Sequence, residues 1–344
     1  MKNTEYTGKK LSEGSVEFDI PPYDPDNGLV TAVNIAIALK RPLLVRGMPG
    51  TGKSRLAESI AFDLYGKDYK NHLFEWKIKS TSKAKDGLYS YDHLKRLRDA
   101  QMKESVEIDI DKHDRYLKFG PLGQAFLLGA KEKNTNRPII LIDEIDKAEI
   151  DFPNDLLTEM ENKEFEIDEI DEIDENQGFN INLRGVTVKI SKKNTAKSAN
   201  PIIIITSNDE RELSDAFLRR CIFYYIDLPD KEKLIAIVKA HLKFEYQKAN
   251  DGDKINVTNI ENNITTLVGS FFKLQKEMLD EEMNKIPTTS EVLDFIKSVA
   301  YLHQQGTITK EQLQQIDPKE RPFISTLIKT ANDWERYLGK GKRE

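Results

Sequence analysis

Three short runs of continuous apolar residues stand out in the first two thirds of the chain. The runs are Pro42–Val45, Pro138–Ile142 and Pro201–Thr206. Each is rich in Ile, Leu or Val and ends in a polar turn, and such runs are typical of parallel strands that are buried on both faces. Residues 29–40 and 53–64 carry helical patterns, the second with the i, i+4, i+8 stripe of an amphipathic helix. Together the patterns predict an α/β domain with a central parallel sheet flanked by helices.

The pattern becomes helical after Pro229. No strong strand run is visible there, and three helices are predicted, over Lys231–Gln247, Ile264–Met278 and Ser290–Leu302. We therefore expect a small all-helical domain that follows a boundary at Asp227–Asp230. The predicted organisation is a flexible N-terminal arm over residues 1–16, the α/β domain over 17–228, the helical domain over 229–305 and a helical C-terminal tail over 306–344.

One segment of the α/β domain, residues 164–175, is low in complexity and rich in carboxylates. Its isoleucines, including Ile167, Ile170 and Ile173, recur every three residues. We expect an acidic insertion over about 164–200 that forms a solvated hairpin or extended loop, since charged side chains at sheet edges block aggregation. The alternatives are a docking surface for a basic partner, the lining of a channel, and metal binding. The basic stretch 189–199 is predicted to be a connection.

The composition excludes several classes of protein. The 344 residues include 52 Lys and Arg against 58 Asp and Glu, a net charge of −6, whereas a dedicated nucleic-acid binder is expected to carry a basic face. The single cysteine, Cys221, excludes an internal disulfide, and no Cys/His cluster suggests zinc. No apolar run approaches the roughly 18 residues of a membrane span, and the N-terminus lacks the apolar core of a signal peptide. We therefore expect a cytoplasmic protein that does not bind membranes, and the net charge disfavours nucleic acid as its partner without excluding a local basic patch.

The clearest chemical signal is GMPGTGKS at residues 47–54, which fits the phosphate-loop pattern GxxxxGK[ST]. Its glycines allow a backbone path on which a Cβ would intrude, so that the amides can face phosphate oxygens. The helix predicted to start near Lys53 adds unpaired N–H groups and the positive end of its dipole. The Lys53 amine can reach the β- and γ-phosphates, and the Ser54 hydroxyl can ligate Mg²⁺. The residues that we expect to bind nucleotide are Gly47, Pro49, Gly50, Thr51, Gly52, Lys53, Ser54 and Arg55.

An acidic pair ends the second apolar run, in the sequence IILIDE. Burying carboxylates at a strand end costs free energy, so their presence there indicates a functional role. We expect Asp143 to hold Mg²⁺ together with Ser54. Glu144 stands one residue further on, where its carboxylate could polarise a water for attack on the γ-phosphate. The cofactors predicted from the two motifs are ATP and Mg²⁺.

The segments GMPGTGKS and ILIDEIDKA together resemble the Walker A and Walker B motifs of the AAA+ ATPases, and the resemblance covers roughly residues 15–305. It implies a P-loop NTPase fold in which a helical lid follows the α/β domain. It also implies a homo-oligomeric ring, usually of six subunits, with active sites at subunit interfaces. Asn208, two residues after the third apolar run, resembles sensor 1, which orients the attacking water or contacts the γ-phosphate. The segment ELSDAFLRRC resembles the arginine-finger region, with Arg220 as the first candidate for a finger acting in trans and Arg219 as the second.

Finer features resemble the MoxR branch of this family. They are GPLGQAFLLGA at 120–130 and the series TSN, REL, AFLRRC and FYYIDLPD around residues 206–230. The resemblance implies a chaperone-like ATPase that remodels or activates a partner protein, often one with a von Willebrand A domain. The sequence departs from the family at residues 286–292, where the usual sensor 2 arginine is absent. Thr289, Ser290 or Lys285 are the candidates to couple the lid to nucleotide instead.

Three functions remain open on the sequence alone. The first is a ring-forming remodeller that hydrolyses ATP. The second is a nucleotide-gated switch or scaffold, for example in a bacterial signalling or anti-phage system, in which binding and assembly matter more than turnover. The third is a nucleic-acid motor, against which the net charge argues. Asp86–Tyr89 and Gly178–Phe179 are candidates for an aromatic loop that grips substrate, and the alternative for each is a surface loop anchored by an aromatic ring.

Overall fold

The fold is described from a computed structural model. The structure describes residues 5–102, 113–131, 136–170, 178–195, 200–248, 257–283, 285–330 and 333–334. The chain divides into two compact units, one composed of residues 1–7, 26–46 and 54–225, the other of residues 8–25, 47–53 and 226–344. We call them the α/β unit and the helical unit, and the phosphate-loop residues 47–53 belong to the helical unit.

The described residues of the α/β unit are built on a five-stranded sheet with the order β11-β1-β10-β5-β2. The strands are β1 (Leu43–Gly47), β2 (Leu73–Lys77), β5 (Ile139–Asp143), β10 (Ile202–Ser207) and β11 (Ile222–Ile226). The pairs β1–β10, β10–β5 and β5–β2 are all parallel. The three apolar runs therefore form three adjacent central strands, and every residue of β5 and β10 is buried. This confirms the predicted α/β fold with its parallel sheet.

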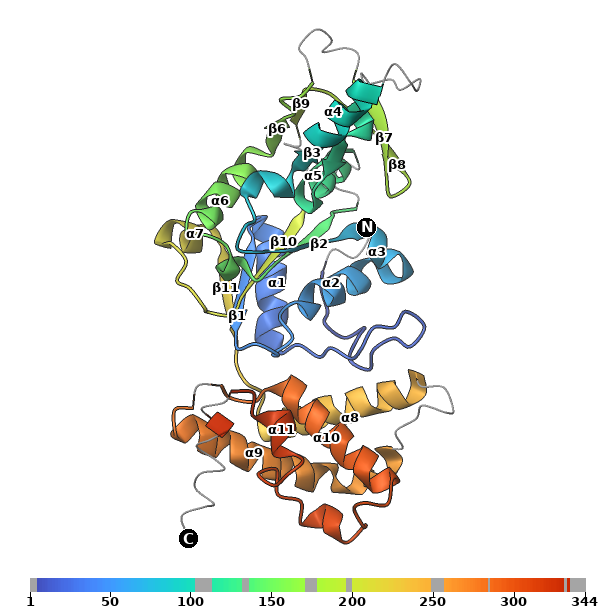
Figure 1. Ribbon diagram of the computed structural model, residues 1–344, viewed down its shortest axis with the longest axis vertical. Coiled ribbons are helices and arrows are strands. Elements are labelled where there is room, and N and C mark those ends of the chain that lie inside the picture. Colours follow the sequence, from blue (N-terminus) through green and yellow to red (C-terminus); the bar gives the residue numbers. More distant parts are fainter. Residues whose placement is uncertain are drawn as a thin grey trace. The chain divides into compact units, whose positions relative to one another are not determined.

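The α/β unit also contains helices, some of which contact this sheet (Figure 1). They are α1 (Asn27–Leu39), α2 (Arg55–Tyr65), α3 (Tyr69–His72), α4 (His93–Met102), α5 (Pro121–Lys131), α6 (Phe152–Asn162) and α7 (Asp215–Arg220). The Asp26 carboxylate caps α1 by accepting a hydrogen bond from the Leu29 amide at 2.9 Å, which satisfies one of the donors left free at a helix start. One apolar core joins α5 and α6 to the sheet, with Phe126, Leu156 and Ile140 fully buried. Burial of apolar surface, at about 0.8 kcal/mol per methylene, is the main stabilisation of this unit.

The acidic segment begins as part of the core. β6 (Glu164–Glu166) pairs antiparallel with β9 (Lys193–Thr195), and β7 (Phe179–Leu183) with β8 (Val186–Ile190) forms a hairpin that contacts α5 (Figure 1). Ile167 and Ile190 are completely buried, and Asp168 forms an ion pair with Lys85 at 2.8 Å. The prediction that residues 189–199 are a connection was wrong for β9 and the end of β8, because Ile190 is an apolar anchor within the basic stretch. Residues 171–177 and 196–199, with Ile173, lie outside the described residues.

The proposal of an aromatic gripping loop at Asp86–Tyr89 does not fit the structure. The segment β3 (Tyr89–Tyr91) pairs with β4 (Leu117–Phe119), and only 3% of the Tyr89 surface is exposed. Its ring lies 6.2 Å from that of Phe165, between centroids, within the core. The alternative, a surface loop anchored by an aromatic ring, fits better, because Asp86 is exposed and the Tyr89 ring is buried. The ring of Phe179, the other candidate, is partly buried and packs against the same core.

The helical unit has its own core. Its main helices are α8 (Lys231–Lys248), α9 (Ile264–Asp280) and α10 (Thr289–Gln304), which match the predicted helices closely. Residues 306–330 differ from the predicted helical tail, because they contain only the short helices Gln312–Gln314 and α11 (Ile324–Leu327). Prolines interrupt helices, and the chain has them at positions 318 and 322. Leu313 and Phe323 are buried in the same core, so this segment is part of the helical unit. Residues 331–332 and 335–344 lie outside the described residues.

The N-terminal segment is anchored from residue 5 onward, in contrast to the predicted flexible arm. The Tyr6 side chain is 1% exposed, and its hydroxyl lies 2.8 Å from that of Ser59 on α2. The amide and hydroxyl of Thr7 both donate to Asp63, at 2.6 and 2.8 Å. Within the helical unit, Leu11 is also buried. The Tyr6–Ser59 and Thr7–Asp63 contacts join residues more than fifty positions apart, so the spacing of residues along the chain could not predict them. Residues 1–4 lie outside the described part.

Candidate nucleotide-binding site

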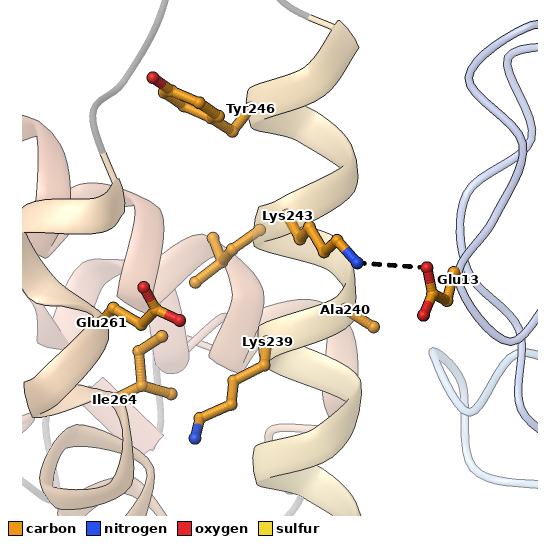
Figure 2. Close-up of a pocket in the computed structure, with 8 residues that line it drawn as sticks. Glu13, Lys239, Ala240, Lys243, Tyr246, Glu261 and Ile264 are labelled. Atoms are coloured by element: carbon orange, nitrogen blue, oxygen red, sulfur yellow. Dashed lines mark hydrogen bonds and ion pairs between the residues drawn. The ribbon is translucent and has the colours of Figure 1, made fainter.

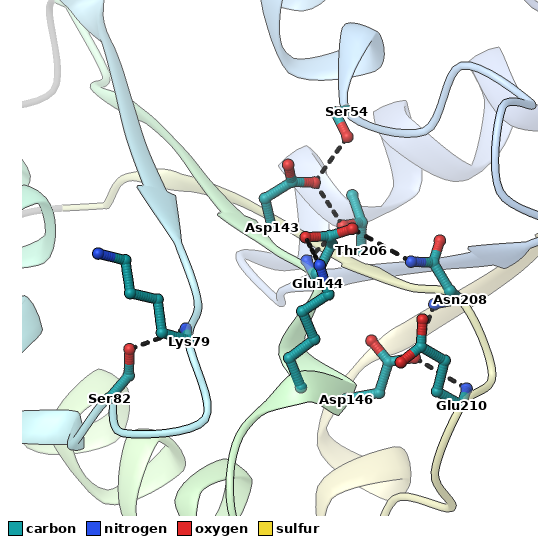
Figure 3. Close-up of polar contacts among 10 residues, drawn as sticks. Ser54, Lys79, Ser82, Asp143, Glu144, Asp146, Thr206, Asn208 and Glu210 are labelled. Atoms are coloured by element: carbon teal, nitrogen blue, oxygen red, sulfur yellow. Dashed lines mark hydrogen bonds and ion pairs between the residues drawn. The ribbon is translucent and has the colours of Figure 1, made fainter. Parts of the chain in front are cut away.

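Polar side chains gather where two adjacent strands end. β5 ends at Asp143 and β10 at Ser207, and the two strands are paired in register with Ile142 opposite Ile205. Since the strands are parallel, their carboxyl ends meet at the same edge of the sheet, which is where open α/β folds place their ligands. Figure 3 shows the resulting cluster, in which residues that follow β5 face residues that end or follow β10.

Asp143 is the centre of this cluster. Its Oδ1 accepts hydrogen bonds from the Ser54 hydroxyl at 2.6 Å and from the Thr206 hydroxyl at 2.7 Å (Figure 3). The Asp143 residue is 7% exposed, and these bonds offset the cost of burying a carboxylate. Hydroxyl and carboxylate oxygens are the hard ligands that Mg²⁺ takes, and adjacent ligands at about 2.1 Å from the ion lie about 3 Å apart. The two residues predicted to hold Mg²⁺ therefore present suitable oxygens at a suitable spacing.

Glu144 is held by contacts at both its backbone and its side chain. Its amide donates to the Thr206 hydroxyl at 2.9 Å, and its backbone takes a left-handed conformation with φ of 60°, which costs a non-glycine residue about 1–2 kcal/mol. The Asn208 amide group donates to Oε1 at 3.3 Å, and the Lys147 amine donates to Oε2 at 2.6 Å. The hydrogen bond to Glu144 raises the pKa of Lys147. The structure thus brings two of the predicted catalytic side chains, Glu144 and Asn208, into contact.

Asp146 fixes the turn that carries Asn208. Its Oδ2 accepts hydrogen bonds from the backbone amides of Asn208 at 2.8 Å and Glu210 at 3.0 Å (Figure 3). The Asp146 residue is 2% exposed. An ion pair of 2.7 Å between Arg46, in β1, and Asp209 holds the other side of the same turn. Asn208 is therefore positioned by its backbone, which leaves its side chain directed at Glu144.

The phosphate loop lies in the helical unit and has the predicted backbone. Gly47, Gly50 and Gly52 have φ angles of 151°, 80° and 86°, in the region that favours glycine. The Lys53 amine is folded over the loop and donates to the carbonyl oxygens of Gly47 at 2.7 Å and Met48 at 2.8 Å. A cation enclosed by the backbone of a glycine-rich loop is the arrangement that holds phosphate groups.

The remaining loop residues differ in their surroundings. The Thr51 hydroxyl donates to the Met48 carbonyl at 2.8 Å and so closes the turn. Pro49 is exposed, and the Arg55 guanidinium forms an ion pair of 3.1 Å with Glu58 on its own helix. A direct role of Arg55 toward nucleotide stays a prediction.

The start of α10 contacts the phosphate loop within the helical unit. A Cβ added to Gly50 would lie 2.3 Å from the Thr288 hydroxyl oxygen and 3.0 Å from that of Ser290. Thr288 and Glu291 form a capping box at the start of α10, in which the Glu291 carboxylate accepts from the Thr288 amide at 2.9 Å and from its hydroxyl at 2.8 Å. Of the residues considered in place of the sensor 2 arginine, Ser290 thus lies against the loop, whereas the Lys285 side chain is exposed.

Comparison with known proteins identifies the family. Residues 42–221 match the AAA domain, dynein-related subfamily, over more than half of the chain. The chain belongs to this AAA family. The matched span begins at β1 and ends after α7, so it includes the phosphate loop, the acidic pair and the two arginines.

Other comparisons add little to the AAA assignment. No curated protein gives a match to the chain. Among solved structures, domain III of the Thermotoga maritima replication initiation protein DnaA is similar at 13% identity with a TM-score of 0.39, over 84% of this chain and 90% of that one. Membership of the AAA family implies nucleotide binding. In the part of the chain that the structure describes, no helix has the length and apolarity needed to cross a membrane.

The two candidate finger arginines of the AAA domain end α7. Arg220 donates from Nε to Glu161 on α6 at 2.5 Å and from Nη1 to the Ala216 carbonyl at 3.1 Å. The side chains of Arg219 and Arg220 are both exposed. Among the contacts made by described residues, none joins either arginine to the cluster around Asp143.

Several residues of the site were not predicted from the sequence: Lys147, Asp146, Thr206 and Thr288. Thr206 was placed in the third apolar run as a strand residue only. Aligning the ends of the second and third runs as parallel neighbours would have set Thr206 beside Asp143, because Ile205 pairs with Ile142. Asp146 and Lys147 stand inside the Walker B segment, two and three residues after Glu144. Their positions in the sequence did not predict which groups they would bond to.

Replacing Thr206 with valine is expected to destabilise the α/β unit by about 1–3 kcal/mol. Valine keeps the shape but removes the hydroxyl that bridges the Asp143 carboxylate and the Glu144 amide, so both buried groups lose a partner. The measurement is the midpoint of urea unfolding, with the exposed Thr158→Val on α6 as the matched control. Equal midpoints for the two variants would contradict the bridging role.

A separate cavity of about 270 Å³ lies in the helical unit (Figure 2). Lys239 and Lys243 from α8 line it together with Glu13 and Glu261, and Lys243 is paired with Glu13 at 3.2 Å. Two cations and two anions give the cavity no preference for a charged ligand. None of the predicted site residues lines it.

Proposed function

We propose that this chain is a Mg²⁺-dependent ATPase whose active site is completed by a neighbouring subunit. The observation that carries the proposal is the chain of contacts from Ser54 through Asp143 and Thr206 to Glu144 and Asn208. In these contacts, two oxygens that could bind a metal ion lie next to a carboxylate that could serve as a base and an amide that could orient a water.

The phosphates would be held by the Lys53 amine and by the loop amides that the positive φ angles at Gly47, Gly50 and Gly52 allow. Ser54 and Asp143 would hold Mg²⁺, which when bound neutralises charge on the β- and γ-phosphate oxygens. Ser54 follows Lys53 directly in the chain, so binding of phosphates at the loop and binding of the metal ion are linked through the backbone.

Glu144 would accept the proton of the attacking water, and Asn208 would orient that water. In the structure both Glu144 oxygens are engaged, one by Asn208 and the other by Lys147. A water that gives its proton to Glu144 would take the place of the Lys147 amine at that carboxylate, so the Lys147 contact would be released first. We interpret the paired arrangement as the resting state of the site.

The assembly is proposed to be a homo-oligomeric ring, and the position of the arginines supports it. Arg220 is exposed at the end of α7 and bonds to Glu161 rather than to the cluster around Asp143. Catalysis of phosphoryl transfer depends on positive charge near the transferred group, and an arginine supplied in trans is a common source. A neighbouring subunit would receive Arg220, with Arg219 beside it, at its own nucleotide.

The finer assignment to the MoxR type rests on the resemblance of residues 120–130 and of the segment from Thr206 to Asp230. On that basis the ATPase would act as a chaperone-like remodeller or activator of a partner protein, such as one with a von Willebrand A domain. Within the structure, GPLGQAFLLGA forms most of α5, whose Phe126 is fully buried.

Removal of Mg²⁺ tests the ATPase. Phosphate release from ATP by the full chain is expected to fall at least about 100-fold when EDTA replaces Mg²⁺, because Ser54 and Asp143 can no longer position a metal ion on the phosphates. A rate unchanged by EDTA would contradict the assigned roles of Ser54 and Asp143. The control adds an excess of Mg²⁺ back to the EDTA sample and should restore the rate.

A further inference from the structure

The Arg41 side chain makes a fork of contacts with the segment that ends α7. Its Nε donates to the Arg220 carbonyl at 3.1 Å, and its Nη2 donates to the carbonyls of Cys221, at 3.1 Å, and Arg219. One guanidinium therefore binds three successive carbonyl oxygens that lie about 180 residues away in the sequence. Arg41 stands outside the sequence motifs described above.

An arginine side chain is well suited to bind the carbonyl groups at the end of a helix. The last carbonyls of a helix have no partner within the helix, and they form the negative end of its dipole. Arginine offers five N–H donors in a rigid plane, so that it can bond to several acceptors in a fixed geometry, as lysine cannot. Arg41 thus caps α7 and fixes the backbone from which the side chains of Arg219 and Arg220 project.

Arg41 also precedes the strand that leads to the phosphate loop of its own subunit. Arg41 stands two positions before β1, and β1 ends at Gly47, the first glycine of the phosphate loop. Next to the fork, the Ile222 amide donates to the Pro42 carbonyl at 2.8 Å, so that β11 begins against the residue after Arg41. The strand that leads to the phosphate loop and the backbone of the two arginines are therefore joined at one point.

We propose that Arg41 is a positioning residue for the arginine that a subunit presents to its neighbour. The inference rests on the proposed function, because it assumes that Arg220 or Arg219 acts in trans. Arg41 touches neither nucleotide nor metal in this role. It sets the direction in which α7 ends, and its loss would impair the active site of the next subunit rather than that of its own chain.

Mixing experiments distinguish a trans effect from a general loss of stability. Alone, Arg41→Ala is expected to lower kcat at least about 10-fold with less than about a 2-fold change in KM for ATP, as for an interaction made only in the transition state. Mixed with an excess of Glu144→Gln subunits, the phosphate released per Arg41→Ala subunit should rise at least about 3-fold, because its intact site then receives a well-placed arginine from a neighbour. Arg41→Lys should behave like Arg41→Ala, since a single amine does not reproduce the fork.

The matched control is Arg184→Ala. Arg184 stands between β7 and β8, and its guanidinium also donates to backbone carbonyls, those of Lys70 and Leu73, rather than to any carbonyl of α7. The activity of this variant should not rise on mixing with Glu144→Gln. If it rises as much as that of Arg41→Ala, or if Arg41→Ala and Arg41→Lys gain nothing on mixing, the positioning role is overturned.

Arg220→Ala mixed with Glu144→Gln separates this inference from the proposed function. A gain for Arg220→Ala without a gain for Arg41→Ala would overturn the role of Arg41 and leave the trans arginine in place. No gain for either mixture would overturn the trans arrangement itself, and the inference with it.

Discussion

Glu144→Gln is expected to slow ATP hydrolysis by about 10²–10⁴-fold while ATP is still bound. Glutamine keeps the size of the side chain and can still contact Asn208, but it cannot accept a proton from water. The phosphate loop and the metal-binding oxygens of Ser54 and Asp143 remain, so binding of ATP should be conserved. The measurement pairs kcat for phosphate release with a titration of ATP into the same protein.

The matched control for Glu144→Gln is Glu149→Gln, an exposed carboxylate five residues further along the chain. It should hydrolyse ATP at the rate of the unmodified protein. A Glu144→Gln protein that also kept the unmodified rate would show that another group takes the proton. The alternative of a nucleotide-gated switch would gain support if partner activation survived this substitution.

Arg220→Ala is expected to slow hydrolysis by about 10³-fold at protein concentrations where assembly is complete. The loss arises because the neighbouring site lacks the positive charge that stabilises the transferring phosphoryl group. In the structure Arg220 bonds to Glu161 at 2.5 Å, an exposed pair that contributes little to stability. The variant should therefore fold and bind ATP normally, which thermal unfolding and ATP titration check.

Arg219→Ala separates the two candidate fingers. It removes the adjacent arginine of α7 and should cost less activity than Arg220→Ala if Arg220 is the residue that reaches the next subunit. The opposite order would transfer the role to Arg219. Unmodified rates for both variants would contradict an arginine finger at the end of α7.

The central part of the fold was predictable because it depends on local pattern and simple geometry. Continuous apolar runs indicated β1, β5 and β10, and parallel pairing then required their ends to meet, which brought Asp143 and Asn208 to one edge. The glycines of GMPGTGKS likewise predicted positive φ angles that the structure shows. These features depend on residues close together in the sequence.

The features that were missed depend on contacts between distant segments. Tyr6 is a single aromatic residue in a polar stretch, and its burial depends on Ser59 in α2. The basic stretch begins within a strand because the apolar Ile190 side chain is buried in the core of the α/β unit. Asp146 and Arg41 bond to backbone groups more than sixty residues away, and a side chain shows no sequence signal for the backbone that it will meet.

The central claim is that each nucleotide site is completed by a neighbouring subunit. The most direct test measures phosphate release per subunit, with Mg²⁺ present, as the protein concentration is raised from the nanomolar to the micromolar range, with Glu144→Gln as the baseline. Hydrolysis per subunit is predicted to rise with concentration and then to saturate. A rate that stays at the Glu144→Gln baseline at every concentration would contradict completion of the site by a neighbour. A substantial rate that does not change with concentration, while the protein is shown to be monomeric, would contradict it too.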